Sequence, residues 1–304
     1  MNQNVPVMLD ACVAMRGSYD NLVERADGAL KWLVSKGVRV DATRTQKLMK
    51  SISQMSDAVR SGKAQEPNLG QLWEISELDD LIQIATQLEH IDDPRFLATL
   101  AKVTGGPHLL EEEKTTGGSI QGRNATFELF AAARFTRAGL PALFKSDADA
   151  TIETPLGAVA LECKRIAAAE KLERNIGEAA SQIMNRISND GIKAGIVCVS
   201  LSRLVHQIAL ENRGNIFADT SEFRDMLRAM LASWGPAITA ACGHLAPSVL
   251  AIGMHYKLPF IDKSTCAPTM LSRFMLYNLL DKTHQQAMLE LGVYIHERLG
   301  ASTR

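Results

Sequence analysis

Apolar residues recur at helical spacing along roughly the first hundred positions of the chain. The pattern predicts helices over residues 19–37, 43–62, 73–90 and 94–103. Gly37 and Gly62 are suited to cap the first two, because glycine readily adopts the left-handed conformation that ends many helices. Charged residues of both signs lie on the faces of these helices that are opposite the apolar ones. We therefore expect a helical region over 1–104 with an apolar interior and a solvated surface.

The helical pattern stops between Thr104 and Gly122. This stretch contains Gly105-Gly106-Pro107, an acidic run at 111–113 and a further Gly-Gly pair, and such a cluster of chain breakers is typical of a linker or a mobile loop. We therefore place a domain boundary here. The expected division is a helical N-terminal domain over 1–104, a linker over 105–122 and a second domain over 123–304.

After this boundary helical and strand-like patterns alternate, which is typical of an α/β domain with a mixed central sheet. Helices are predicted over residues 124–138, 170–189, 221–234 and 269–298. Strands are predicted between the first two helices and over residues 192–201 and 248–256.

Composition limits the class of protein. The chain has 304 residues, 46% of them apolar and 22% charged, which is ordinary for a soluble globular protein. Its formal net charge of −1 provides no global attraction for nucleic acid, so any contact with phosphates must come from a local group of Lys and Arg.

Cysteine usage and hydropathy point to the cytoplasm. The five cysteines are odd in number and scattered, without the paired spacing of a structural zinc site or a disulfide framework. No secretory signal is expected at the N-terminus. The most apolar stretch, 237–254, is interrupted by Gly243, His244 and Pro247, so no membrane span is expected.

The segment from Asp149 to Lys164 predicts a β-hairpin with a turn at Thr154-Pro155-Leu156-Gly157. If Glu153 faces Ala158, the same register places Asp149 directly across the hairpin from Glu162. Strand alternation then puts Glu162 and Lys164 on one face of the second strand.

Two facing carboxylates repel each other unless a cation lies between them. Oxygen ligands that water and phosphate can complete suit Mg²⁺, with Mn²⁺ as a substitute. The alternative is an ordinary amphipathic hairpin whose charged side chains form surface pairs.

At this point residues 122–201 resemble the PD-(D/E)xK nuclease superfamily. The resemblance rests on the order helix, strands carrying Asp and then ExK, helix and strand, with Glu162-Cys163-Lys164 as the ExK tripeptide. The proline that precedes the family's aspartate is Ala148 here, so Asp147 remains an alternative to Asp149.

The resemblance implies a restriction endonuclease-like core, αβββαβ, and a set of site residues. Metal ligands would be Asp149, Glu162 and the backbone carbonyl of Cys163, and Lys164 would contact the attacking water. Gln182, on the second helix, would support the nucleophile or the phosphate.

Glu128 is a further candidate, as a metal ligand either directly or through water. It lies on an apolar stripe of the helix over 124–138, where an unpaired carboxylate is costly. Alternatively, Glu128 only favours the first turn of a helix capped by Asn124.

The implied function is Mg²⁺-dependent endonuclease hydrolysis of DNA, in restriction, repair or defence against phage, with RNA as an open alternative. Local basic residues flank the motif, namely Arg123, Arg134, Arg137, Arg165, Lys171 and Arg174. The N-terminal helices are expected to bind DNA, a protein partner or a second copy of the chain. The alternative is a non-catalytic scaffold that binds DNA or protein through a degenerate nuclease fold.

Overall fold

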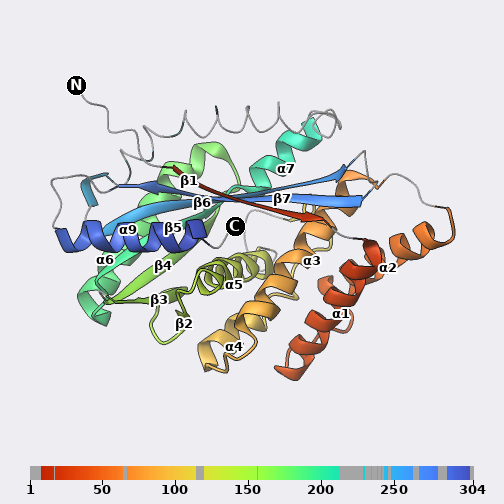
Figure 1. Cartoon of the computed structure of the whole chain (residues 1–304), viewed down its shortest axis with the longest axis horizontal. Helices are drawn as coiled ribbons and strands as arrows, with labels where there is room; N and C mark the ends of the chain where they lie inside the picture. The colour runs from red at the N-terminus through yellow and green to blue at the C-terminus, as the bar shows by residue number, and fades with distance from the viewer. Residues whose placement is uncertain are drawn as a thin grey trace. The chain divides into compact units, whose positions relative to one another are not determined.

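The protein is an α/β chain with a mixed β-sheet, seen in a computed structural model (Figure 1). The structure describes residues 8–16, 18–63, 67–113, 120–155, 157–211, 243–245, 248–262, 267–279 and 286–301, with isolated positions between 229 and 241. The predicted helix over 221–234 lies almost entirely outside these residues. Among the described residues, no helix combines the length and apolar character needed to cross a bilayer.

The chain divides into two compact units. The first unit comprises Met1–Cys12, Arg134–Tyr256 and Ser272–Arg304, and the second comprises Val13–Ala133 and Lys257–Leu271. The domain division expected at 105–122 stays a prediction.

Four predicted helices are confirmed in the second unit. They are α1 (Tyr19–Ser35), α2 (Arg44–Arg60), α3 (Leu69–Leu88) and α4 (Pro94–Leu100). The first three pack against one another (Figure 1). Helix α3 begins four residues before the predicted start because Asn68 and Gln71 form a capping box, in which each side chain accepts the other residue's backbone N–H.

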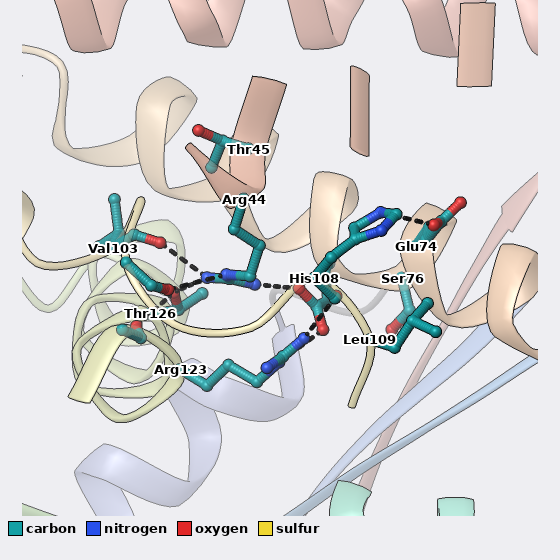
Figure 2. Close-up of polar contacts among 12 residues, drawn as sticks. Arg44, Thr45, Glu74, Ser76, Val103, His108, Leu109, Arg123 and Thr126 are labelled. Atoms are coloured by element: carbon teal, nitrogen blue, oxygen red, sulfur yellow. Dashed lines mark hydrogen bonds and ion pairs between the residues drawn. The ribbon is translucent and has the colours of Figure 1, made fainter. Parts of the chain in front are cut away.

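The interior of the second unit contains charged side chains as well as apolar ones. Arg44 is 3% exposed and pairs with Glu77 of α3, and its guanidinium also donates to the carbonyls of Val103 and Gly105. Figure 2 shows the Arg44 guanidinium directed toward the Val103 carbonyl and the Thr126 hydroxyl. These bonds fasten the chain that follows α4 to the start of α2.

Arg123, 5% exposed, is a second partner of Glu77 and also donates to the carbonyl of His108. Nε2 of His108 lies 2.7 Å from Oε1 of Glu74. Figure 2 shows the His108 ring directed toward the Glu74 carboxylate. The pKa of Glu74 is raised because burial outweighs the hydrogen bond from Ser51, which lowers it.

Lys257 is a further buried cation that contacts the acids of α3. It is 1% exposed, contacts Asp79 and Asp80 of α3, donates to the carbonyl of Ser76 and lies over the ring of Phe130. We call α3's acids and the basic side chains that contact them the α3 ionic cluster; its members are Glu74, Glu77, Asp79, Asp80, Arg44, His108, Arg123 and Lys257.

Helix α5 (Gln121–Arg137) begins in the second unit and continues into the first. Its start is packed tightly, since a Cβ at Gly122 would lie 2.2 Å from the Gly105 carbonyl oxygen. The helix begins three residues before the predicted start, so Asn124 lies inside it and is not its N-cap. Glu128 is consequently well beyond the first turn.

The sheet has seven strands in the order β1-β7-β6-β5-β4-β3-β2. The strands are β1 (Met8–Arg16), β2 (Ala142–Leu143), β3 (Ala150–Thr154), β4 (Gly157–Arg165), β5 (Ala194–Ser200), β6 (Val249–Asp262) and β7 (Ala267–Asn278). Strands β2, β3 and β4 are antiparallel neighbours, whereas β4, β5 and β6 run parallel.

Two predictions of helix were wrong. Residues 8–16 form β1, although the region 1–104 looked almost wholly helical, and their pairing partner is β7, far away in the sequence. Residues 267–278 form β7, and the closing helix is shorter, α9 (Gln286–Ala301). Both faces of β7 are largely buried over residues 270–276, so apolar residues do not alternate with exposed polar ones along it and the pattern resembles that of a helix.

Helices cover both faces of the sheet in the first unit. Helix α6 (Leu172–Asp190), preceded by a short 3₁₀ turn, lies against β4 and β5 (Figure 1). Gly195 of β5 permits this approach, since a Cβ there would meet Ile183 at 2.6 Å. On the opposite face, Phe135 of α5 packs edge-on against Phe274 of β7 at a centroid distance of 5.9 Å. Helix α7 (Ser202–Glu211) follows β5.

Candidate active site

The hairpin register predicted from the turn is confirmed. Glu153 pairs with Ala158 and Ala150 pairs with Leu161. Asp149 comes directly before β3, so the same register carries it to the position opposite Glu162. The Asp149 carboxylate (Oδ2) accepts the backbone N–H of Cys163 at 2.6 Å, which fixes it beside the main chain of the ExK tripeptide.

Glu162 and Lys164 both point toward α6, as strand alternation predicted. The Lys164 ammonium donates to Oε1 of Gln182 at 2.7 Å. Glu162 lies 3.5 Å from Nε of Arg186, measured from its Oε1. The structure therefore brings together Asp149, Glu162, Lys164 and Gln182, while their catalytic roles stay predictions.

Strand β4 is paired with β3 as far as Leu161, which faces Ala150, and with β5 from Val159 up to Arg165. Beside Glu162 and Lys164 the strand is therefore held by β5 on one side, and on the other the Cys163 N–H bonds to the Asp149 side chain. A rigid strand is a suitable support for a site, because catalytic geometry tolerates little displacement.

Glu162 is electrostatically unusual. It is 2% exposed, and its pKa is raised to about 7, first by burial and then by the negative charge of Asp149. Lys164 and Arg186 lower that pKa, but not enough to offset burial. Within the described part of the chain, Glu162 Oε1 is buried and has no hydrogen-bond partner. Glu162 is thus a buried acid whose burial outweighs the effect of the two neighbouring cations.

Arg186 was missed by the sequence reasoning. It follows Gln182 by four residues on α6, so helical periodicity would have placed it on the same face. Its guanidinium (NH1) also lies 3.7 Å from Oδ2 of Asp147, whose side chain is 63% exposed. The exposed position of Asp147 favours Asp149 as the partner of Glu162.

Glu128 is a half-buried residue of α5. The apolar stripe expected around it is present, since Ala125, Ala131 and Ala132 are buried. Glu128 belongs to the second unit and the Glu162 site to the first. Its role as a ligand stays a prediction.

The donor set around Glu162 can be tested for its fit to a divalent ion. Among the described residues, no group of three or more His, Cys, Asp and Glu side chains gathers to hold a metal. Mg²⁺ does not need such a group, because it keeps several waters and commonly takes one or two carboxylates. The unbonded buried oxygen of Glu162, beside a second carboxylate, fits that pattern.

Comparison with known proteins adds no assignment. No family model, no curated protein and no solved structure matches this chain.

Proposed function

We propose that this protein is a Mg²⁺-dependent nuclease of the PD-(D/E)xK type that hydrolyses phosphodiester bonds in DNA. The observation that carries the proposal is Glu162, a buried carboxylate with an oxygen that lacks a hydrogen bond, next to Asp149 and on the same face as Lys164. The element order α5-β2-β3-β4-α6-β5 supports a restriction endonuclease-like core.

Asp149 and Glu162, with the carbonyl of Cys163, would hold the ion. A bound divalent cation supplies Lewis acidity, which promotes formation of hydroxide near neutral pH and stabilises charge on the phosphate. The chain's own contribution begins with orientation, because the Cys163 N–H fixes the Asp149 carboxylate.

Lys164 is the second functional group. Gln182 accepts a hydrogen bond from its ammonium, which fixes the direction of the side chain. An ammonium held in this way can position a water molecule by hydrogen bonding and stabilise the negative charge that develops on a phosphate. Gln182 acts through Lys164 and is therefore a positioning residue.

Local charge supports a polyanionic substrate. Arg165 at the end of β4 and Lys171 in the turn that follows are partly exposed, and Arg174 is largely exposed on α6. Because the net charge is only −1, such local cations must supply the attraction for phosphates. DNA is the proposed substrate, RNA the alternative, and restriction, repair or phage defence in the cytoplasm the proposed setting. A second copy or a protein partner would bind through the N-terminal helices.

The test is cleavage of plasmid and single-stranded DNA, with RNA in parallel, by purified protein with Mg²⁺ or Mn²⁺ and with EDTA. Glu162→Ala and Lys164→Ala are each expected to reduce the rate by at least about a hundredfold. Glu153→Ala and Lys145→Ala are matched controls, since both residues are exposed near the hairpin. Equal activity in site variants and controls would contradict the proposal.

A non-catalytic scaffold remains the second candidate, and Arg186 is the observation that favours it. A guanidinium beside Glu162 partly fills the electrostatic role of a metal ion. Under this alternative the protein binds DNA or a partner without cleavage. It would bind no Mn²⁺, and its ligand affinity would be unchanged by Lys164→Ala.

A further inference from the structure

Arg186 is a cationic neighbour of Glu162 that the proposed chemistry does not use. It lies on α6 one turn after Gln182, and the helix directs both side chains toward β4. The Arg186 side chain is 23% exposed, compared with 3% for Glu162 and 63% for Asp147. Arg186 therefore lies between the buried carboxylate of Glu162 and the exposed carboxylate of Asp147.

The contacts of Arg186 with both acids are long. Its Nε is 3.5 Å from Glu162 and its NH1 is 3.7 Å from Asp147. A guanidinium fully engaged with a carboxylate forms hydrogen bonds of about 2.7–2.9 Å. Within the described residues, neither Arg186 Nε nor Glu162 Oε1 has a hydrogen-bond partner. The contact of Arg186 with Glu162 is therefore long and weak, although it still lowers the pKa of Glu162.

A divalent ion held by Glu162 would repel the guanidinium that now lies beside the same oxygen. Asp147 offers Arg186 a second anionic partner nearer to solvent. At that position an arginine is suited to contact phosphate oxygens, which planar guanidinium groups bind in pairs.

We propose that Arg186 competes with the divalent cation for Glu162 and, once displaced toward Asp147, binds a phosphate of the nucleic acid. The inference rests on the function proposed above and adds a regulatory link to the same site. Because binding equilibria are reciprocal, metal and nucleic acid then strengthen each other's binding through Arg186.

The first test measures Mn²⁺ affinity by electron paramagnetic resonance at pH 8.5 under argon, without nucleic acid. Arg186→Gln is expected to bind Mn²⁺ about three- to tenfold more tightly than the wild type, because a competing charge is removed. Arg174→Gln is the matched control on the same helix, since Arg174 is exposed and pairs with Glu178. It is expected to keep wild-type affinity.

The second test measures the affinity for a labelled DNA duplex and a labelled single strand by fluorescence anisotropy, with Ca²⁺ or with EDTA. Ca²⁺ is expected to increase the affinity of the wild type and of Arg174→Gln at least about fivefold more than that of Arg186→Gln. Arg186→Lys keeps the charge but loses the paired donors, so its increase should be intermediate.

The outcomes separate the two proposals. Equal or weaker Mn²⁺ binding by Arg186→Gln, or an equal Ca²⁺ effect in all variants, overturns the role of Arg186 and leaves the nuclease intact if the wild type binds Mn²⁺ and cleaves DNA. Failure of the wild type to bind Mn²⁺ overturns both.

Discussion

Two largely buried carboxyl groups, Asp80 in the second unit and Glu162 in the first, are raised in pKa for partly different reasons. Burial raises the pKa of Asp80 to about 6 and contributes most to the value of about 7 for Glu162. After burial, the strongest influence on Asp80 is Lys257, which lowers its pKa. The strongest influence on Glu162 after burial is Asp149, another acid, which raises it.

This difference distinguishes an acid that is paired with a cation inside the protein, Asp80, from an acid that could still bind a ligand, Glu162. In the α3 ionic cluster a cation directly contacts the acid, as Lys257 does with Asp80 and Arg44 with Glu77. At the candidate site the closest described cation stands 3.5 Å from Glu162 Oε1 and forms no hydrogen bond with it. Burial without a strong partner costs stability and is typical of functional sites.

The largest expected effect is in the α3 ionic cluster. Lys257→Met should lower the free energy of unfolding by about 3–5 kcal/mol, because Asp79 and Asp80 remain buried without their cation. Urea unfolding at pH 7 measures this. Lys31→Met, which removes an exposed lysine paired with Asp27, is the control and should leave stability unchanged. The double variant Lys257→Met/Asp80→Asn should recover part of the loss, and no recovery would mean that packing dominates.

The second-largest expected effect is an increase in the free energy of unfolding when Glu162 is replaced. Glu162 has a folded-state pKa of about 7 against an ordinary value of 4.5, so its ionisation favours the unfolded chain. The resulting loss of stability begins as pH rises above 4.5 and is complete above about 7. Glu162→Gln should therefore increase the free energy of unfolding by about 2–3 kcal/mol at pH 8 and change it little at pH 4. Urea unfolding across this pH range measures it.

The exposed Glu153→Gln is the control for that series and should show no such pH dependence. Destabilisation of Glu162→Gln at pH 8 would mean that Arg186 and Lys164 compensate the charge fully. The contrast with Asp80 would then disappear.

The smallest expected effect is the stabilisation of the folded protein by Mg²⁺. At a Mg²⁺ concentration ten times its dissociation constant, the wild type should gain about 1.4 kcal/mol in unfolding free energy. Glu162→Gln should gain much less, because the amide is a poorer ligand than the carboxylate. Lys257→Met should respond like the wild type, since its cluster is not a metal site. Thermal unfolding with and without Mg²⁺ measures this, and equal gains in wild type and Glu162→Gln would contradict a metal site there.

The candidate site was partly predictable because its geometry is local. The turn between Thr154 and Gly157 sets the register over a few residues, and alternation then orients Glu162 and Lys164. Gln182 is a prediction from the resemblance, which implies a glutamine on the polar face of the second helix. Arg186 follows it by one helical turn, so helical periodicity places it on the same face.

The α3 ionic cluster was not predictable from local pattern. Lys257 meets Asp80 across 177 positions of sequence, and no local spacing brings them together. Residues 267–278 resemble a helix in sequence because a strand that is buried on both faces shows no clean alternation. In both cases the structure depends on contacts between residues that are far apart in the sequence.

The pairing of β1 with β7 has a consequence for how the protein is made. About 250 residues lie between these two adjacent strands, and a ribosome adds roughly 5–20 residues each second. The segment of β1 therefore waits on the order of ten seconds or more before its partner is synthesised, with its backbone donors and acceptors still unpaired by β7. Completion of this edge of the sheet must be a late event in folding on the ribosome.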